Sequence, residues 1–261
     1  MIKQILKYLK HYFAANKNGH GIHSPFVYSL VENVFSNNHA FYDFEELLKL
    51  RIELEKDNTI LSINDLGAGS KTFTSTNRKV KDIAKRGISS KTQSEALFKL
   101  INYLNCTTIV ELGTSIGLNT LYLSKSGKET KVYTIEGSEA LCNYAKALFN
   151  KHKATNIISV LGNFDVKLPE LFNEIKTFSL LYIDGNHTYE GTISYFNLAL
   201  KHKTESSVIV FDDIYWSDEM EKAWREIQNN SEVTISIDCF YFGIVFFRKE
   251  NKQKEHFRIT L

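Results

Sequence analysis

The segment from Ile109 to Thr120 constrains the fold most, and it reads IVELGTSIGLNT. An apolar strand ends at Glu111, glycines follow at positions 113 and 117, and a helix begins near Leu118. A strand, a glycine turn and a helix in this order present backbone N–H groups to a ligand at the carboxyl end of a strand. The spacing G-x-x-x-G differs from the G-x-G-x-x-G that holds a dinucleotide pyrophosphate. The segment therefore predicts an α/β protein with a ligand loop, and it disfavours an NAD-dependent dehydrogenase.

Strand and helix patterns alternate from about Ser90 onward, which predicts a mostly parallel sheet. Ser90 and Gln93 form a capping-box pattern at the start of a helix. The expected strands are residues 109–112, 131–135, 157–161, 179–183, 207–211, 233–237 and 241–248. The last two have no helix between them, so they predict an antiparallel hairpin that closes the sheet.

The first 88 residues differ from the rest, and two or three helices are expected there, over 2–15, from Pro25 and from Asp43. The expected division is a helical cap or lid over residues 1–88 and an enzyme domain over 89–261. Residues 65–70 (DLGAGS) resemble a nucleotide loop, but a polar and basic segment follows them, so a glycine turn is the favoured interpretation. The basic residues of 71–86 would attract an anionic substrate if this segment forms a lid.

The motif E-x-G-x-x-x-G resembles motif I of the class I S-adenosylmethionine (SAM)-dependent methyltransferases. The resemblance covers about residues 90–248 and implies a Rossmann-like, seven-stranded, mostly parallel sheet with a closing antiparallel hairpin. It implies SAM as the cofactor, with its amino acid end held by the loop after the first strand. The cofactor-binding residues implied by this motif are Glu111, Gly113, Thr114, Ser115 and Gly117.

Glu136 ends the second expected strand, about twenty residues after Gly117. A carboxylate at this position suits a bidentate contact with ribose hydroxyls, as in dinucleotide folds. The resemblance adds Gly137 to the cofactor site and places Asn163 in the loop that binds adenine. The alternatives are a solvated strand end for Glu136 and a simple turn residue for Asn163.

Acidic residues follow the fourth and fifth expected strands, in the runs IDGNHTYE (183–190) and FDDIYW (211–216). Neighbouring parallel strands bring Asp184, Asp212 and Asp213 to one edge, where uncompensated carboxylates would raise each other's pKa. A divalent, oxygen-preferring cation such as Mg²⁺ would resolve this repulsion. The arrangement resembles metal-dependent small-molecule O-methyltransferases, and the form D-G-x-H-x-Y is closest to the branch that methylates sugar hydroxyls.

The expected mechanism assigns catalysis to His187 and Asp184. The metal lowers the pKa of a substrate hydroxyl, and His187 serves as the general base or orients Asp184. Asp184 is also expected near the cofactor, and the acceptor pocket is expected from Tyr189, Tyr215 and Trp216. The competing interpretations are a carboxylate that contacts only the cofactor, an ordinary turn at 212–213, and a metal-free mechanism based on His187.

Composition leaves several function classes open and gives no strong nucleic-acid signal, because the net charge of the 261 residues is only +2. An RNA or protein methyltransferase that uses residues 71–86, and a non-catalytic scaffold, are the alternatives to a small-molecule or sugar acceptor. Three widely spaced cysteines favour a reducing cytoplasm, and no apolar run is long enough to span a membrane. A membrane-surface role for the N-terminal lysines is a minor alternative to a homodimer formed through the N-terminal region.

Overall fold

The computed structural model describes residues 2–16, 21–37, 39, 41–63, 75–251 and 253–260. The backbone contacts divide the chain into two compact units. Unit 1 comprises Met1–Asn37 and Thr177–Leu261, and unit 2 comprises Asn38–Lys176. The N-terminal helices are therefore shared between the units. The expected domain boundary at residues 88/89 remains a prediction about which part folds independently.

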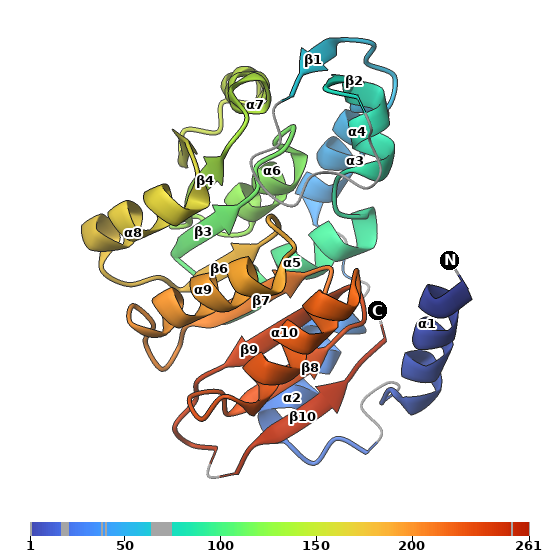
Figure 1. Ribbon diagram of the computed structural model, residues 1–261, viewed down its shortest axis with the longest axis vertical. Coiled ribbons are helices and arrows are strands. Elements are labelled where there is room, and N and C mark those ends of the chain that lie inside the picture. Colours follow the sequence, from blue (N-terminus) through green and yellow to red (C-terminus); the bar gives the residue numbers. More distant parts are fainter. Residues whose placement is uncertain are drawn as a thin grey trace. The chain divides into compact units, whose positions relative to one another are not determined.

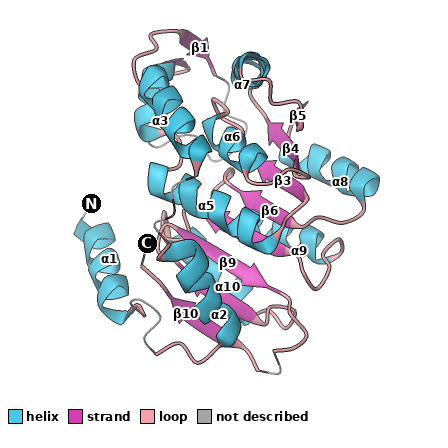
Figure 2. Cartoon of the chain, turned by 180° about the vertical axis from the view of Figure 1, so that it is seen from behind, coloured by secondary structure: helices cyan, strands magenta, loops and turns pink. Residues whose placement is uncertain are grey.

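Unit 2 carries three parallel strands, β3 (Thr108–Leu112), β4 (Lys131–Glu136) and β5 (Ile157–Leu161), with β4 in the middle. A helix follows each strand: α6 (Leu118–Lys125), α7 (Glu139–Lys151) and α8 (Phe164–Ile175) (Figure 2). Helix α5 (Lys91–Leu104) precedes β3 and begins with the predicted capping box, in which the Ser90 hydroxyl and the Gln93 amide each bind the other residue's backbone N–H. This alternation is the expected one.

The segment before α5 packs onto the same unit. It contains α3 (Tyr42–Leu54), a short hairpin of β1 (Ile60–Ser62) and β2 (Asn77–Lys79), and α4 (Val80–Arg86). Buried leucines of α3 share a core with residues of α6 and α7, and Lys125 on α6 binds the carboxylates of Asp43 and Glu46 at 3.1 and 2.9 Å. Asp43 lies inside the first turn of α3, which begins one residue before the expected position. The glycine motif at 65–70 and Lys71 lie outside the described residues.

Unit 1 carries the strand order β10-β8-β9-β7-β6. Strands β6 (Leu180–Ile183) and β7 (Val208–Asp212) are parallel, whereas β9 (Phe242–Phe246) runs antiparallel to both β7 and β8 (Ile235–Asp238). Helices α9 (Tyr189–Leu200) and α10 (Asp218–Asn229) follow β6 and β7, and α10 crosses β8 and β9 in Figure 1. The predicted α/β fold with a closing hairpin is confirmed.

Strand β10 (Glu255–Arg258) is one strand more than the seven expected, and it pairs in parallel with β8. Its sequence EHFR alternates in exposure, because only one face of this edge strand is covered. A polar four-residue segment gives too weak a pattern to be recognised as a strand.

The first residues of the chain belong to unit 1, as α1 (Ile2–Ala14), α2 (Pro25–Leu30) and the π-helical turn η1 (Val31–Phe35). Helix α2 starts at Pro25 as predicted, and the Phe26 ring packs on Phe246 of β9 at 5.1 Å. Asn16 forms an isolated parallel bridge with Ile259. Within the described residues, no helix combines the length and hydropathy needed to cross a bilayer.

Candidate functional site

The loop after β3 turns through three residues with positive φ: Gly113 at +103°, Ser115 at +51° and Gly117 at +85°. The Gly113 N–H donates to the carbonyl of Ile135 on β4 at 3.0 Å, and the Gly117 N–H donates to Thr114 at 2.9 Å. The Thr114 hydroxyl lies 2.5 Å from that of Thr134, so this buried residue faces β4. These bonds hold the loop in one conformation, so the loop is preorganised for a ligand.

Gly117 is required for packing as well as for its positive φ. A Cβ at this position would lie 2.7 Å from the Phe149 ring and 3.0 Å from the Ala145 Cβ on α7. We expect Gly117→Ala to lower the free energy of unfolding by about 2–4 kcal/mol, from backbone strain together with overpacking. Urea denaturation measures this loss, and Gly87→Ala is a control, because Gly87 is exposed and has an ordinary φ of −121°. Equal small losses in both variants would contradict the close packing of Gly117.

Glu111 at the end of β3 is fully buried, a placement that the sequence does not reveal. Its carboxylate accepts hydrogen bonds from Asn119 at 3.1 Å, Thr120 at 2.5 Å and Thr134 at 2.7 Å. Three donors offset the cost of burying this charge, and they tie β3 to β4 and to the start of α6. Glu111 therefore braces the cofactor loop, and its contact with the ammonium group of the ligand remains a prediction.

Glu136 ends β4 and is 8% exposed. One carboxylate oxygen accepts the backbone N–H of Ser115 in the glycine loop, and the other accepts that of Ser138, each at 2.9 Å. The structure thus joins Glu136 to the predicted loop across neighbouring strands. A carboxylate oxygen accepts more than one hydrogen bond, so these two contacts leave acceptor capacity for ribose hydroxyls.

The remaining predicted cofactor residues of unit 2 are Gly137 and Asn163. Gly137 lies in the turn between Glu136 and α7 and is half-buried. Asn163 is exposed and caps α8, with its Oδ1 accepting the N–H of Asp165 at 2.8 Å. Capping explains the choice of residue at 163 without a ligand, and adenine binding at this position remains a prediction.

The acidic cluster lies in unit 1 after the paired strands β6 and β7. The His187 Nε2 lies 3.7 Å from Asp184 Oδ1 and 3.9 Å from Asp213 Oδ2, so the imidazole stands between two carboxylates. The Tyr182 hydroxyl on β6 donates to Asp184 at 3.3 Å. Asp213 adopts a positive φ of +53°, which turns the chain after β7. The predicted convergence of these four acidic and histidine side chains (184, 187, 212 and 213) is present within the unit.

Burial raises the pKa of Asp212 well above its usual 3.8, and the nearby carboxylates of Asp184 and Asp213 raise it further. Burial also raises the pKa of Asp184, against the lowering effect of His187 and of a hydrogen bond from Asp212. The interaction between these two carboxyl groups adds to the rise in the pKa of Asp212 and opposes the rise in the pKa of Asp184. Burial raises the pKa of Asp213 too, and the charge of His187 opposes this shift.

This donor set suits an oxygen-preferring divalent cation in its chemistry. Asp184, Asp212 and Asp213 supply carboxylate oxygens, which are the ligands that such a cation prefers. Their placement fits a metal site less well than their chemistry does. In the described part of the chain, no three His, Cys, Asp or Glu side chains are grouped to hold a metal ion. Ligation would require these carboxylates to turn toward a common point.

The three predicted pocket residues differ in their contacts and exposure. The Tyr189 hydroxyl donates to Glu226 on α10 at 2.5 Å, and its ring lies under the Lys222 ammonium at 4.1 Å. The Tyr215 hydroxyl donates to Asp238 at 2.6 Å, so it points toward the end of β8. Trp216 is 36% exposed and is the one of the three whose side chain lies largely at the surface.

Asp238 is a buried residue that sequence patterns did not single out. Its carboxylate accepts from Tyr215, from the N–H of Phe240 at 3.0 Å and from His11 Nε2 at 3.1 Å. Burial opposes ionisation, but these hydrogen bonds outweigh it and hold the pKa below the usual 3.8. No period or motif marks such a residue, because its partners lie 23 and 227 positions away.

This lowered pKa predicts an acid-sensitive contribution to stability. The ionised Asp238 stabilises the fold above its unfolded pKa, and the contribution is lost as the pH falls through its folded pKa. We expect Asp238→Asn to cost about 1–3 kcal/mol near pH 7 and progressively less below pH ~4. Urea denaturation of both proteins across this range measures the difference. A difference that stays constant down to pH ~2 would contradict the assignment.

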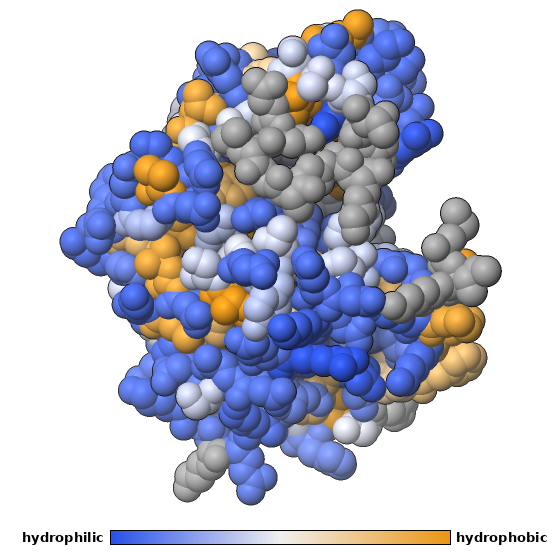
Figure 3. All heavy atoms as spheres, viewed as in Figure 1, coloured by the Kyte–Doolittle hydropathy of each residue, from blue (hydrophilic) through white to orange (hydrophobic). Residues whose placement is uncertain are grey.

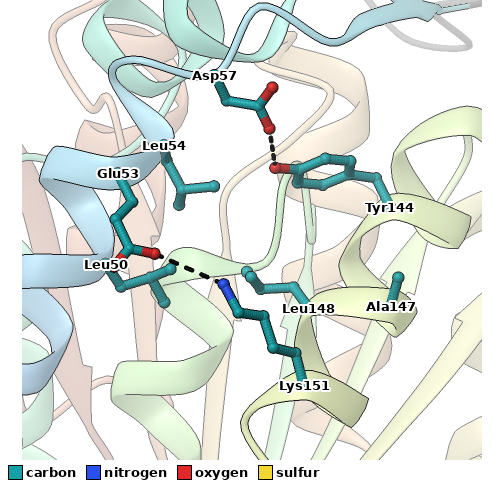
Figure 4. A pocket seen from close by; sticks show the side chains of 8 residues that line it. All are labelled: Leu50, Glu53, Leu54, Asp57, Tyr144, Ala147, Leu148 and Lys151. Atoms are coloured by element: carbon teal, nitrogen blue, oxygen red, sulfur yellow. Dashed lines mark hydrogen bonds and ion pairs between the residues drawn. The ribbon is translucent and has the colours of Figure 1, made fainter.

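A separate cavity of about 360 Å³ lies between α3 and α7 of unit 2 (Figure 4). Asp57 accepts from the Tyr144 hydroxyl at 2.7 Å, and Glu53 lies 3.6 Å from the Lys151 ammonium, with leucine side chains between these pairs. Burial and the bond to Asp57 raise the pKa of Tyr144. The cavity includes none of the predicted site residues, and its polar pairs join α3 to α7.

Comparison with known proteins gives both a family match and a shared fold. Residues 110–214 match a family model described as a methyltransferase domain. The O-methyltransferase TomG from Streptomyces achromogenes, solved with SAM, is 20% identical over 62% of this chain and 82% of TomG, with a TM-score of 0.55. The O-methyltransferase from Bacillus cereus, solved with SAH, is 18% identical over 85% and 97%, with a TM-score of 0.56.

Cofactor-bound Rv0187 from MTB is 18% identical over 88% of this chain and 99% of its own, with a TM-score of 0.59. No curated protein matches the sequence. The family match over residues 110–214 and the fold shared with O-methyltransferases agree with the predicted class I methyltransferase fold. The matched range, residues 110–214, contains the glycine loop, Glu136 and the acidic cluster.

Proposed function

We propose that this protein transfers the methyl group of SAM to a hydroxyl group of a small molecule or sugar, with the help of a divalent cation. The acidic cluster after β6 and β7 carries the proposal, because it sets a histidine between two carboxylates. O-methylation is further supported by the O-methyltransferases with which the chain shares its fold. SAM binding is supported by the loop at 113–117 and by Glu136, which binds that loop.

The geometry supports a division of labour in the reaction. The positive-φ loop would hold the methionine end of SAM, Glu136 the ribose and Asn163 the adenine. His187 would accept the proton of the acceptor hydroxyl at Nε2, and the nearby Asp184 carboxylate would stabilise the imidazolium that forms. The acceptor oxygen then bonds to the methyl carbon as the carbon–sulfur bond breaks and SAH leaves, so positioning supplies most of the acceleration.

Asp184, Asp212 and Asp213 would hold the cation, most plausibly Mg²⁺. When bound, such a cation lowers the pKa of a coordinated hydroxyl and neutralises the carboxylates. Cation binding requires the ionised form of all three carboxyl groups, because ligands must be deprotonated. Trp216, Tyr215 and Tyr189 remain the proposed lining of the acceptor pocket, with Trp216 the most accessible of them.

Proposals on the compartment and the oligomeric state of the enzyme follow from its cysteines and its N-terminal residues. Its three cysteines are buried and unpaired, which fits a reducing cytoplasm. A homodimer formed through residues 1–88 remains a proposal, as does their role as an independent cap. An RNA or protein acceptor bound by the basic residues of 75–86 is the alternative, and it is an outcome of the experiment below.

Methyl-labelled SAM offered with three probes tests the proposal. The probes are catechol, a methyl glycoside and a short oligoribonucleotide, each with Mg²⁺ or with EDTA. We expect label in a hydroxyl probe, with the rate reduced at least about 100-fold by EDTA. Label in the oligoribonucleotide alone would contradict the acceptor class. A rate that EDTA leaves unchanged would contradict the metal and favour His187 acting alone.

A further inference from the structure

Helix α1 docks onto unit 1 through a polar face. The Gln4 amide donates to the carbonyl of Tyr215 at 3.0 Å, Lys7 binds Asp218 and Glu221 at 3.2 and 2.5 Å, and His11 binds Asp238. The docking residues 4, 7 and 11 recur at the i, i+3 and i+7 spacing of one helix face. A terminal helix is thus held by specific hydrogen bonds and ion pairs to residues after β7 and β8.

The opposite face of α1 is apolar and exposed. Leu6 is 61% exposed, Leu9 43% and Phe13 79%, and apolar atoms are visible where α1 lies in Figure 3. Burial of leucines therefore contributes little to the docking of this helix. The polar contacts are joined by the ring of Tyr8, whose centroid lies 5.0 Å from that of Phe240 and 6.2 Å from that of Tyr241.

The His11 contact leads to the loop that carries the acidic cluster. Asp238 binds His11 and the Tyr215 hydroxyl with the same carboxylate, and the Tyr215 ring stacks on Phe240 at 5.2 Å. The backbone carbonyl of Tyr241, the residue after Phe240, accepts the N–H of Asp213 at 2.7 Å. The Asp213 carbonyl in turn accepts the N–H of Trp216 at 2.8 Å. Two hydrogen-bonded connections therefore join the Asp238 turn to the loop of residues 212–216.

We propose that Asp238 is a positioning residue, through which His11 on α1 holds the loop of residues 212–216 in the conformation that presents Asp213 and Trp216. The assignment of residues 212–216 to the acceptor side rests on the proposed function, whereas the coupling of this loop to His11 rests on the contacts described above. The N-terminal helix is then a part of the acceptor side of the enzyme. Its role is to fix a loop, and it requires no contact between α1 and the reacting atoms.

Hydrogen–deuterium exchange of the full-length protein tests this coupling. We expect His11→Ala to raise the exchange of peptide 212–217 by about tenfold or more, because the loop loses its fixed partner. His11→Gln restores an N–H donor and should keep exchange within about threefold of the wild type. Leu6→Ala lies on the exposed face of the same helix and is the matched control, with no change expected.

Two results would overturn the proposal. One is faster exchange in peptide 2–14 alone, which would show that α1 is tethered but not coupled to the loop. The other is a general rise that includes β6 and β7, or a failure of His11→Gln to restore protection, which would show a merely structural loss. Calorimetric titration with SAM separates this from the proposed function, because a wild type that binds no SAM would defeat that function and leave the exchange result standing.

Discussion

Asp212→Asn is expected to lower the rate of methyl transfer at least about 100-fold while the affinity for SAM stays within a few-fold. Asp212 is 5% exposed, and burial together with the charges of Asp184 and Asp213 raises its pKa, so a cation at this cluster would relieve the repulsion. Asparagine keeps the shape but cannot ionise, and the cluster would lose one of its three carboxylates. The variant should therefore lose methyl-transfer rate and cation affinity but keep its affinity for SAM.

The measurements are methyl transfer to a hydroxyl probe and calorimetric titration with SAM and, separately, with Mn²⁺. Glu219→Gln is a matched control, since this carboxylate is exposed in the first turn of the next helix. We expect that control to keep both activity and binding. A SAM affinity more than tenfold weaker in Asp212→Asn would instead assign Asp212 to the cofactor site, and full activity would remove it from the mechanism.

Glu136→Ala is expected to weaken SAM binding by about 1.5–3 kcal/mol, the usual value for hydrogen bonds to a charged group. This corresponds to a dissociation constant about 10- to 150-fold higher. Two effects act together in this variant. The ribose hydroxyls lose their acceptor, and the N–H groups of Ser115 and Ser138 lose theirs, so the glycine loop is held less firmly.

Calorimetry on Glu136→Ala and on the control Glu139→Ala separates cofactor binding from surface charge. Glu139 is an exposed carboxylate in the first turn of α7, three residues further along the chain. Its removal changes the net charge equally but should leave the affinity for SAM unchanged. Urea denaturation reports how much of the Glu136 effect comes from loosening of the loop. Equal SAM affinities in the two variants would exclude the ribose role.

The parts of the fold that follow hydrophobic periodicity were predictable from the sequence. Strand β7 is a run of apolar residues buried on both faces, and strand β4 ends at Glu136 as the pattern indicates. The capping box at Ser90 was predictable because both of its partners lie within four residues. Glycine spacing predicted the turn at residues 113–117, since only a few residue types tolerate its positive φ.

What the sequence did not show depends on contacts between distant residues. The sequence does not show that Thr120 and Thr134 donate to the buried carboxylate of Glu111, whose contact with the ligand stays a prediction. The hydrogen bond from the Tyr215 hydroxyl to Asp238 is another such contact, and the role of Tyr215 in the acceptor pocket stays a prediction. A hydroxyl or carboxyl group binds the partner that the fold brings near, and the local sequence pattern does not identify that partner.

Titration of the purified wild-type protein with SAM, followed calorimetrically before and after addition of Mg²⁺, tests the central claim most directly. We expect a single SAM site with a dissociation constant in the micromolar range, and a separate binding heat for Mg²⁺ that disappears in Asp184→Ala. The absence of any SAM heat at millimolar concentration would contradict the assignment of the 113–117 loop and Glu136, and with it the proposed methyl transfer.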